Sequence, residues 1–119
     1  MNIFKKLFGG QKTTEEVRET KEKGFDKVKY EGVRALRMHQ FDLAAKFLEQ
    51  ALQLNAEDLE CRDYLSQAYI SMGNLQQAYA QLQKISEAQS DNIAVLLRMA
   101  DVAYMMEDYI AMTDVCDKA

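Results

Sequence analysis

The residues of this sequence that could carry out chemistry are few and far apart. The chain has one histidine, His39, and two cysteines, Cys61 and Cys116. A zinc site needs three or four ligands at short spacing, and a nucleophilic triad needs a base that activates a Ser or Cys. Because neither pattern is present, we expect no catalytic residues, no metal and no cofactor. His39 is interpreted as a turn residue, since histidine tolerates left-handed backbone better than most residues.

The other residues that could bind a metal or a partner are expected to have structural roles. Acidic residues cluster over 57–63 but lack the spacing and central glycine of a calcium loop. A charged turn with Asp and Glu at a helix start accounts for them. The cysteines are expected to pack as small apolar side chains. Met99, Met106 and Met112 are expected in the core, whereas Met105 is left open between the core and an adaptable binding surface.

Length and charge narrow the class of protein. The chain has 119 residues, enough for one domain, and it lacks proline. Residues 1–30 carry eight Lys/Arg and five Asp/Glu, a net of +3, whereas residues 31–119 carry seven and fourteen, a net of −7. An acidic body does not suit a nucleic-acid partner. The cysteine usage favours a reducing compartment, so we expect a cytoplasmic location.

The N-terminal residues 1–24 are expected to form a basic, polar arm. Its first eight residues place apolar side chains at helical spacing around two lysines. This segment could be a foot on a membrane surface or a partner, or a terminus that packs on its own domain. A polar linker that ends at Gly24 follows, with a capping box at Thr13 and Glu16. The residues of the proposed foot are Ile3, Phe4, Lys5, Lys6, Leu7 and Phe8.

From residue 25 onward the apolar spacing predicts helices separated by short polar breaks. The breaks fall near 39–40, 55–58, 73–74, 89–92 and 107–108. The pattern repeats when the chain is offset by 34 residues, which predicts an all-α chain of helix–turn–helix units. The aligned columns are Gly32/Ser66/Ala100, Leu36/Ile70/Tyr104, Met38/Met72/Met106, Phe41/Leu75/Tyr109, Ala44/Ala78/Met112 and Leu48/Leu82/Cys116.

These columns resemble the tetratricopeptide repeat family over residues 25–119. The resemblance implies an α-α superhelix, a right-handed solenoid of antiparallel helix pairs. Its repeats would span 25–58, 59–92 and, in part, 93–119. The turn glycine of the family appears only as Gly73, and the usual proline after each second helix is replaced by Ala56 and Ser90. Helix ends must therefore be set by polar residues in the breaks near 55–58 and 89–92.

The resemblance also implies a groove, lined by the first helix of each repeat, that binds a peptide or a partner helix. Family members that hold a C-terminal carboxylate use five groove positions, of which only Lys29 and Arg98 match here. We therefore expect an apolar or basic ligand. The expected groove residues are Lys29, Val33, Leu36, Asp63, Gln67, Ile70, Leu97, Asp101 and Tyr104.

The sequence leaves three functions open, and an enzyme is not expected, because no nucleophile, base and oxyanion donor lie at recognisable spacing. The first is a protein-interaction scaffold without catalysis, whose protein or peptide partner is unknown. The second is a membrane-peripheral adapter anchored by residues 1–8, which liposome co-sedimentation with and without residues 1–10 would test. The third is self-association, as a homodimer or as a fragment of a longer repeat protein, because the third repeat presents an uncapped final helix.

Overall fold

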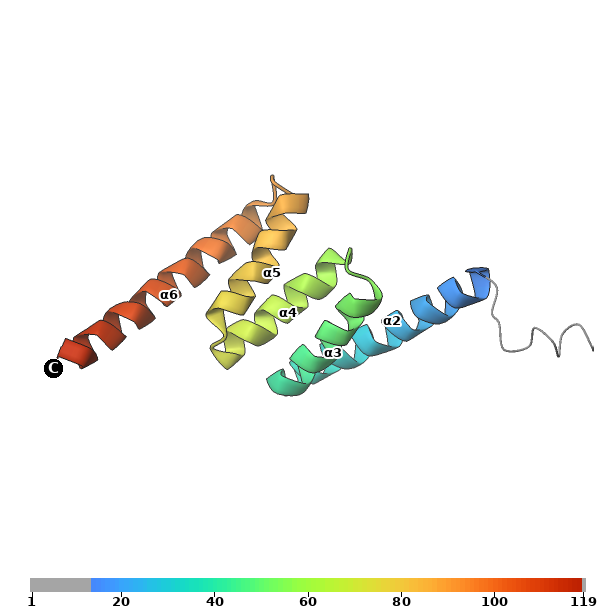
Figure 1. Cartoon of the computed structure of the whole chain (residues 1–119), viewed down its shortest axis with the longest axis horizontal. Coiled ribbons are helices and arrows are strands. Elements are labelled where there is room, and N and C mark those ends of the chain that lie inside the picture. The colour runs from blue at the N-terminus through green and yellow to red at the C-terminus, as the bar shows by residue number, and fades with distance from the viewer. Residues whose placement is uncertain (1–13, 119) are drawn as a thin grey trace, which may run out of the picture.

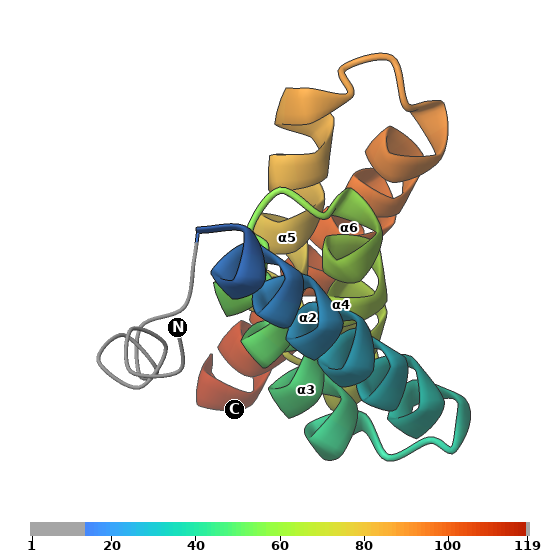
Figure 2. The same ribbon diagram turned by 90° about the vertical axis from the view of Figure 1, so that its right-hand side faces the viewer.

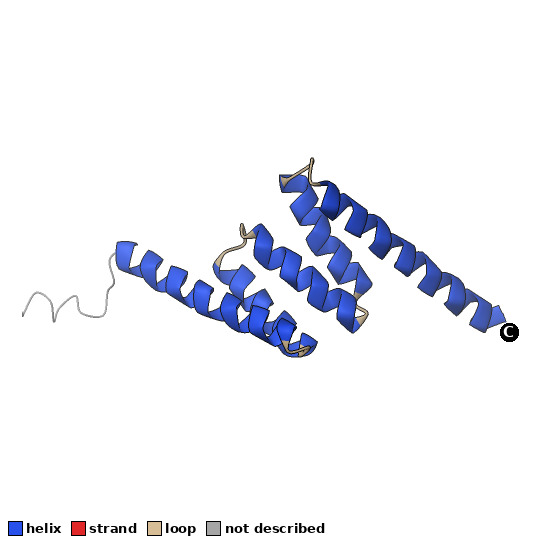
Figure 3. Ribbon diagram, turned by 180° about the vertical axis from the view of Figure 1, so that it is seen from behind, coloured by secondary structure: helices blue, strands red, loops and turns tan. Residues whose placement is uncertain are grey.

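The computed structural model describes residues 14–118, with side chains over residues 15–107. The described part of the chain forms helices and no strand, which confirms the all-α prediction (Figure 3). Helices that follow one another in sequence pack against one another, so the chain builds an α-α solenoid (Figure 1). The helices are α2 (Thr14–Arg37), α3 (Phe41–Leu54), α4 (Leu59–Met72), α5 (Leu75–Ala88) and α6 (Ile93–Lys118).

Small residues set the distance between paired helices. A Cβ atom built at Gly32 on α2 would lie 2.7 Å from Cγ of Leu48 on α3, so only glycine fits at this crossing. Ser66, one repeat later, is fully buried between α4 and its neighbours. Leu48, Leu65 and Leu82 are the largest fully buried side chains, the first two in one apolar cluster and Leu82 in a second. Figure 2 views the stacked helices from the side of α2, with α6 behind.

The turns inside the two helix pairs use left-handed backbone. His39 has φ of 60° and Gly73 has φ of 79°, which confirms that His39 is a turn residue. The backbone N–H of Gly73 donates to the carbonyls of Tyr69 and Ile70, closing the end of α4. Four of the predicted breaks, those near 39–40, 55–58, 73–74 and 89–92, separate helices as expected.

The predicted break near 107–108 is wrong, because α6 continues through it to Lys118. Glu107 occupies the place that His39 and Gly73 hold in the first two turns. Glutamate is a good helix former and enters left-handed backbone at a higher cost than glycine or histidine. The helix therefore continues where the repeat pattern predicts a turn.

Helix α2 likewise runs through Gly24, where the polar linker was expected to end. The polar residues before it are good helix formers, and Arg18 pairs with Glu15 and Glu22 one turn away on each side. The segment expected as a membrane or partner foot, residues 1–8, lies outside the described residues. No helix in the described part of the chain is long and apolar enough to cross a membrane.

Polar side chains close the junctions between repeats. A carboxylate oxygen of Asp58 accepts from the backbone N–H of Cys61 and caps α4. Oδ1 of Asn92 accepts from the backbone N–H of Val95 in the same way at the start of α6. Two of the polar residues expected in these breaks thus set the starts of α4 and α6.

Candidate interaction surface

Charged pairs join each first helix to the first helix of the next repeat. Nζ of Lys29 on α2 lies 2.8 Å from Oε1 of Glu60 on α4 and 2.9 Å from Oδ2 of Asp58. Asp63 on α4 accepts a hydrogen bond from the guanidinium of Arg98 on α6. These contacts align α2, α4 and α6 along one side of the stack, which we call the first-helix face.

The Lys29 ammonium is held in its charged form. Burial alone would lower the pKa of Lys29, but hydrogen bonds to Glu60 and then to Asp58, with the negative charge of both, raise it above the usual lysine value. Nζ also lies 5.6 Å from the centre of the Phe25 ring. Lys29 therefore joins the first two repeats. Its positive charge is balanced by Asp58 and Glu60, so it attracts an anionic ligand only weakly.

The other expected groove residues differ in how accessible they are. Leu36 and Ile70 are half-buried and pack against the core. Leu97 and Tyr104 on α6 are 63% and 66% exposed, so they can contact a ligand. Of the rest, Val33 and Gln67 are half-buried, and Asp101 is exposed.

The first-helix face contains a hollow of about 550 Å³ between α2 and α4. Tyr30, Arg34, Arg37 and Met38 of α2 and Tyr64 of α4 are among its lining residues, and we call it the Tyr30 hollow. None of these five was among the expected groove residues, but Lys29 and Val33, which were expected, line the hollow as well. The signal available in the sequence was the spacing of Tyr30, Arg34 and Met38, which puts them on one face of a helix.

The sequence profile of the tetratricopeptide repeat matches residues 35–102, which is more than half of the chain. The chain belongs to the tetratricopeptide repeat family. Such repeats generally mediate contacts between proteins, so the first-helix face is the first candidate for a binding surface. No curated protein sequence matches the chain.

Helix α6 presents an apolar face that no described helix covers. Ile93, Leu96, Leu97 and Tyr104 are large exposed side chains there, and Ala100 between them is exposed as well. In the earlier repeats the positions equivalent to Ala100 are Gly32 and Ser66, which a second helix buries.

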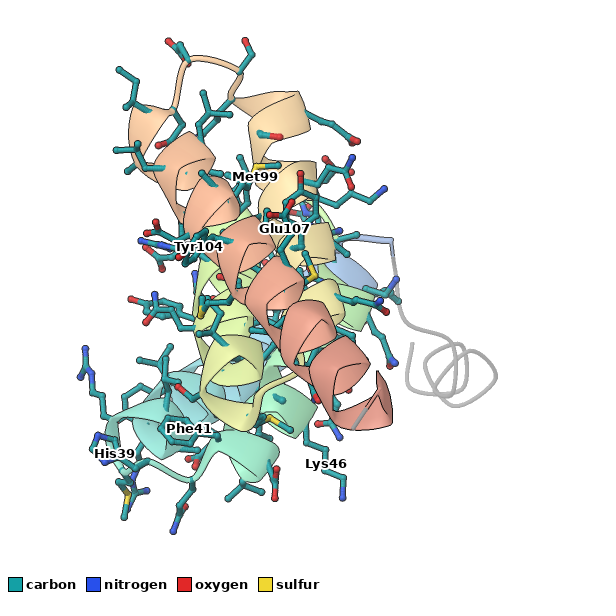
Figure 4. All side chains as sticks on the ribbon, turned by 90° about the vertical axis from the view of Figure 1, so that its left-hand side faces the viewer. His39, Phe41, Lys46, Met99, Tyr104 and Glu107 are labelled. Carbon is teal, nitrogen blue, oxygen red and sulfur yellow. The ribbon has the colours of Figure 1, made fainter. Side chains whose placement is uncertain are left out.

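The opposite side of α6 packs on α5. Val95 and Val102 are buried there, and Met99 and Met106 are half-buried against the same cluster, as expected for those two methionines. Figure 4 shows Met99 on the side of α6 next to α5 and Tyr104 directed away from it. Met105 is 37% exposed. Met112 and Cys116 have no described side chains.

The residues considered for chemistry have structural roles in this repeat protein. His39 stacks on Phe41 beside the turn, with ring centres 5.6 Å apart (Figure 4). Cys61 is fully buried, and its Sγ donates to the carbonyl of Leu48 at 3.4 Å. Burial, followed by the charge of Asp58, raises the pKa of the Cys61 thiol to about 11. Over residues 15–107, His, Cys, Asp and Glu form no cluster that could hold a metal ion.

Proposed function

We propose that this chain is a protein-interaction module that binds a peptide or a partner helix along the first-helix face and has no chemistry of its own. The observation that supports this most is the exposure of Tyr30, Leu97 and Tyr104 on helices that charged pairs hold together. Exposed tyrosines on a rigid scaffold are frequent anchors of protein interfaces. An exposed leucine beside them adds apolar area that a partner can bury.

The pairs Lys29–Glu60 and Asp63–Arg98 support the proposal because they keep charged groups from binding a ligand directly. A ligand then meets a face that is already assembled, so little conformational entropy is lost on binding. The accessible surface of this face includes apolar and aromatic side chains, together with charged residues such as Asp26, Arg34, Arg37, Glu60 and Asp101.

A selection of binders from a random peptide library, followed by affinity measurements, tests the proposal. We expect Leu97→Glu and Tyr104→Ala each to weaken the selected peptides by about tenfold or more, since each removes an anchor worth more than 1 kcal/mol. Val17→Glu is the matched control, because Val17 is 41% exposed on α2, far from these anchors in sequence. Equal loss in Val17→Glu, or no loss in the two groove variants, would contradict the proposal.

A second candidate function is self-association through the apolar face of α6. The observation that favours it is the exposure of Leu96 and Ala100, at positions that a neighbouring helix covers in the earlier repeats. A second copy could place its own α6 across this face, which would make a symmetric contact.

Sedimentation velocity over a range of concentrations tests self-association. We expect a dimer that Ala100→Glu converts to a monomer and that Ala80→Glu, an exposed position on α5, leaves intact. A monomer at every concentration would exclude this function and leave the first-helix face untouched.

A further inference from the structure

The Tyr30 hollow combines apolar side chains with two cations that have no partner in the described structure. Tyr30 and Met38 are 66% and 57% exposed, and Tyr64 across the hollow is half-buried. Arg34 and Arg37 form no ion pair or side-chain hydrogen bond with any described residue. The hollow therefore has room for an apolar group and charge for an anion.

These two arginines differ from the others in the chain. Arg18 pairs with Glu15 and Glu22, and Arg98 pairs with Asp63. Arg62 donates to the side chain of Gln81 at 2.8 Å and to the carbonyl of Ala56 at 3.0 Å. Arg34 and Arg37 thus keep all their donors available, three residues apart on adjacent turns of one helix.

The carboxylates near the hollow do not neutralise them. Glu60 lines the hollow but is held by Lys29, and Asp26, which also lines it, lies more than two helical turns before Arg34. The C-terminal end of α2 stabilises both arginines electrostatically, but its carbonyls do not occupy the guanidinium donors here.

We propose that the Tyr30 hollow binds a short acidic peptide segment, with one or two carboxylates on Arg34 and Arg37 and an adjacent apolar or aromatic side chain against Tyr30, Met38 and Tyr64. The proposal rests on the proposed function and names the chemistry of its ligand. It replaces the expected apolar or basic ligand at this end of the face, because the acidic Asp63 is occupied by Arg98.

Charge complementarity selects this ligand. Guanidinium groups bind carboxylates through paired, planar hydrogen bonds, which a lysine does not reproduce. Residues 31–119 have a net charge of −7, so a long polyanion would be repelled by the rest of the body. A short acidic segment meets the two local cations and avoids most of that repulsion.

The experiment is a random-peptide selection on the full chain, followed by fluorescence titration of the enriched peptides. We expect enriched sequences that place Asp or Glu next to an apolar residue. Arg34→Gln with Arg37→Gln should weaken them by about tenfold or more, and Arg34→Lys with Arg37→Lys should restore only part of the affinity. Lys46→Gln with Lys84→Gln is the matched control, because it removes the same charge from exposed positions on α3 and α5.

Each other result overturns the inference. Equal weakening by both double variants, or binding of heparin as tight as that of the peptides, would show general attraction to cations. Enriched peptides without acidic residues that still respond to Leu97→Glu would refute the acidic ligand and leave the proposed function standing. A selection with no enrichment would contradict both.

Discussion

Nζ of Lys29 lies 2.8 Å from Oε1 of Glu60, and this pair joins the first helix of one repeat to the first helix of the next. The two residues belong to different helix pairs, so their contact depends on how the repeats stack. The same lysine reaches Asp58, the residue that caps α4, at 2.9 Å. The Lys29 side chain thus contacts both the residue that caps α4 and the residue that holds α2 against α4.

Lys29→Ala is expected to lower the free energy of unfolding by about 1 kcal/mol, the upper end for partly exposed pairs. Its raised pKa means that the lysine stabilises the fold fully below its unfolded pKa of about 10.4 and loses this contribution only as pH rises through the higher folded pKa. Urea unfolding should therefore show the same deficit at about pH 6 and about pH 9. Lys27→Ala, an exposed neighbour, is the control, and a deficit that vanishes by pH 9 would contradict this role.

Gly32→Ala is expected to destabilise the chain by up to about 2 kcal/mol, although alanine is the better helix former. The new Cβ would lie 2.7 Å from Cγ of Leu48, which is fully buried and cannot move aside. Gly24→Ala on the same helix meets nothing closer than 3.9 Å and should stabilise by about 1 kcal/mol. Thermal unfolding of the two variants checks this, and a stabilised Gly32→Ala would mean that α2 and α3 are not in close contact there.

Cys61 is expected to resist alkylation in the folded chain. Burial raises its pKa to about 11, so at about pH 8 its thiolate is roughly a hundredfold scarcer than that of an exposed cysteine. Iodoacetamide labelling followed by mass spectrometry in a Cys116→Ser background isolates this thiol. We expect labelling only after urea unfolding, and rapid labelling without urea would show that the Leu48–Cys61 contact is open in solution.

Glu107→Gly is expected to weaken α6 around its predicted turn. Glycine costs about 1 kcal/mol in a helix interior and enters left-handed backbone readily. Amide hydrogen exchange over 103–111 should become faster than in Glu107→Ala, which keeps the helical preference. Equal exchange in the two variants would show that the residue at 107 does not decide whether α6 continues.

The features of the fold that could be predicted are those that depend on residues within one repeat, namely the helix pairs and their turns. The columns of the 34-residue repeat, among them Gly32/Ser66/Ala100, identified the helix pairs. The turn at His39 followed from the tolerance of histidine for left-handed backbone. At Glu107 the apolar columns and the local helix preference point in opposite directions, and the local preference prevailed. The spacing of apolar residues predicts which side of a helix is buried. The residue at the turn position decides whether the helix ends there and the chain turns back.

The candidate surface was less predictable because it forms between repeats. Lys29 and Asp63 were correctly placed on first helices, but nothing in their spacing revealed that Glu60 and Arg98 would bind them. Those pairs depend on the rotation from one repeat to the next, which the sequence of a single repeat does not determine. The Tyr30 hollow was found only in part, through Lys29 and Val33, for the same reason, since Tyr64 completes it from the neighbouring repeat.

Binding of a partner to the first-helix face can be followed by an NMR titration of the labelled full chain with a selected peptide. We expect the largest amide shifts on α2, α4 and α6 around Tyr30, Tyr64 and Leu97, with small shifts over α3 and α5. Shifts concentrated on α3 and α5, around Leu43 and Gln77, would contradict binding on this face, because those two residues line a separate hollow between α3, α4 and α5.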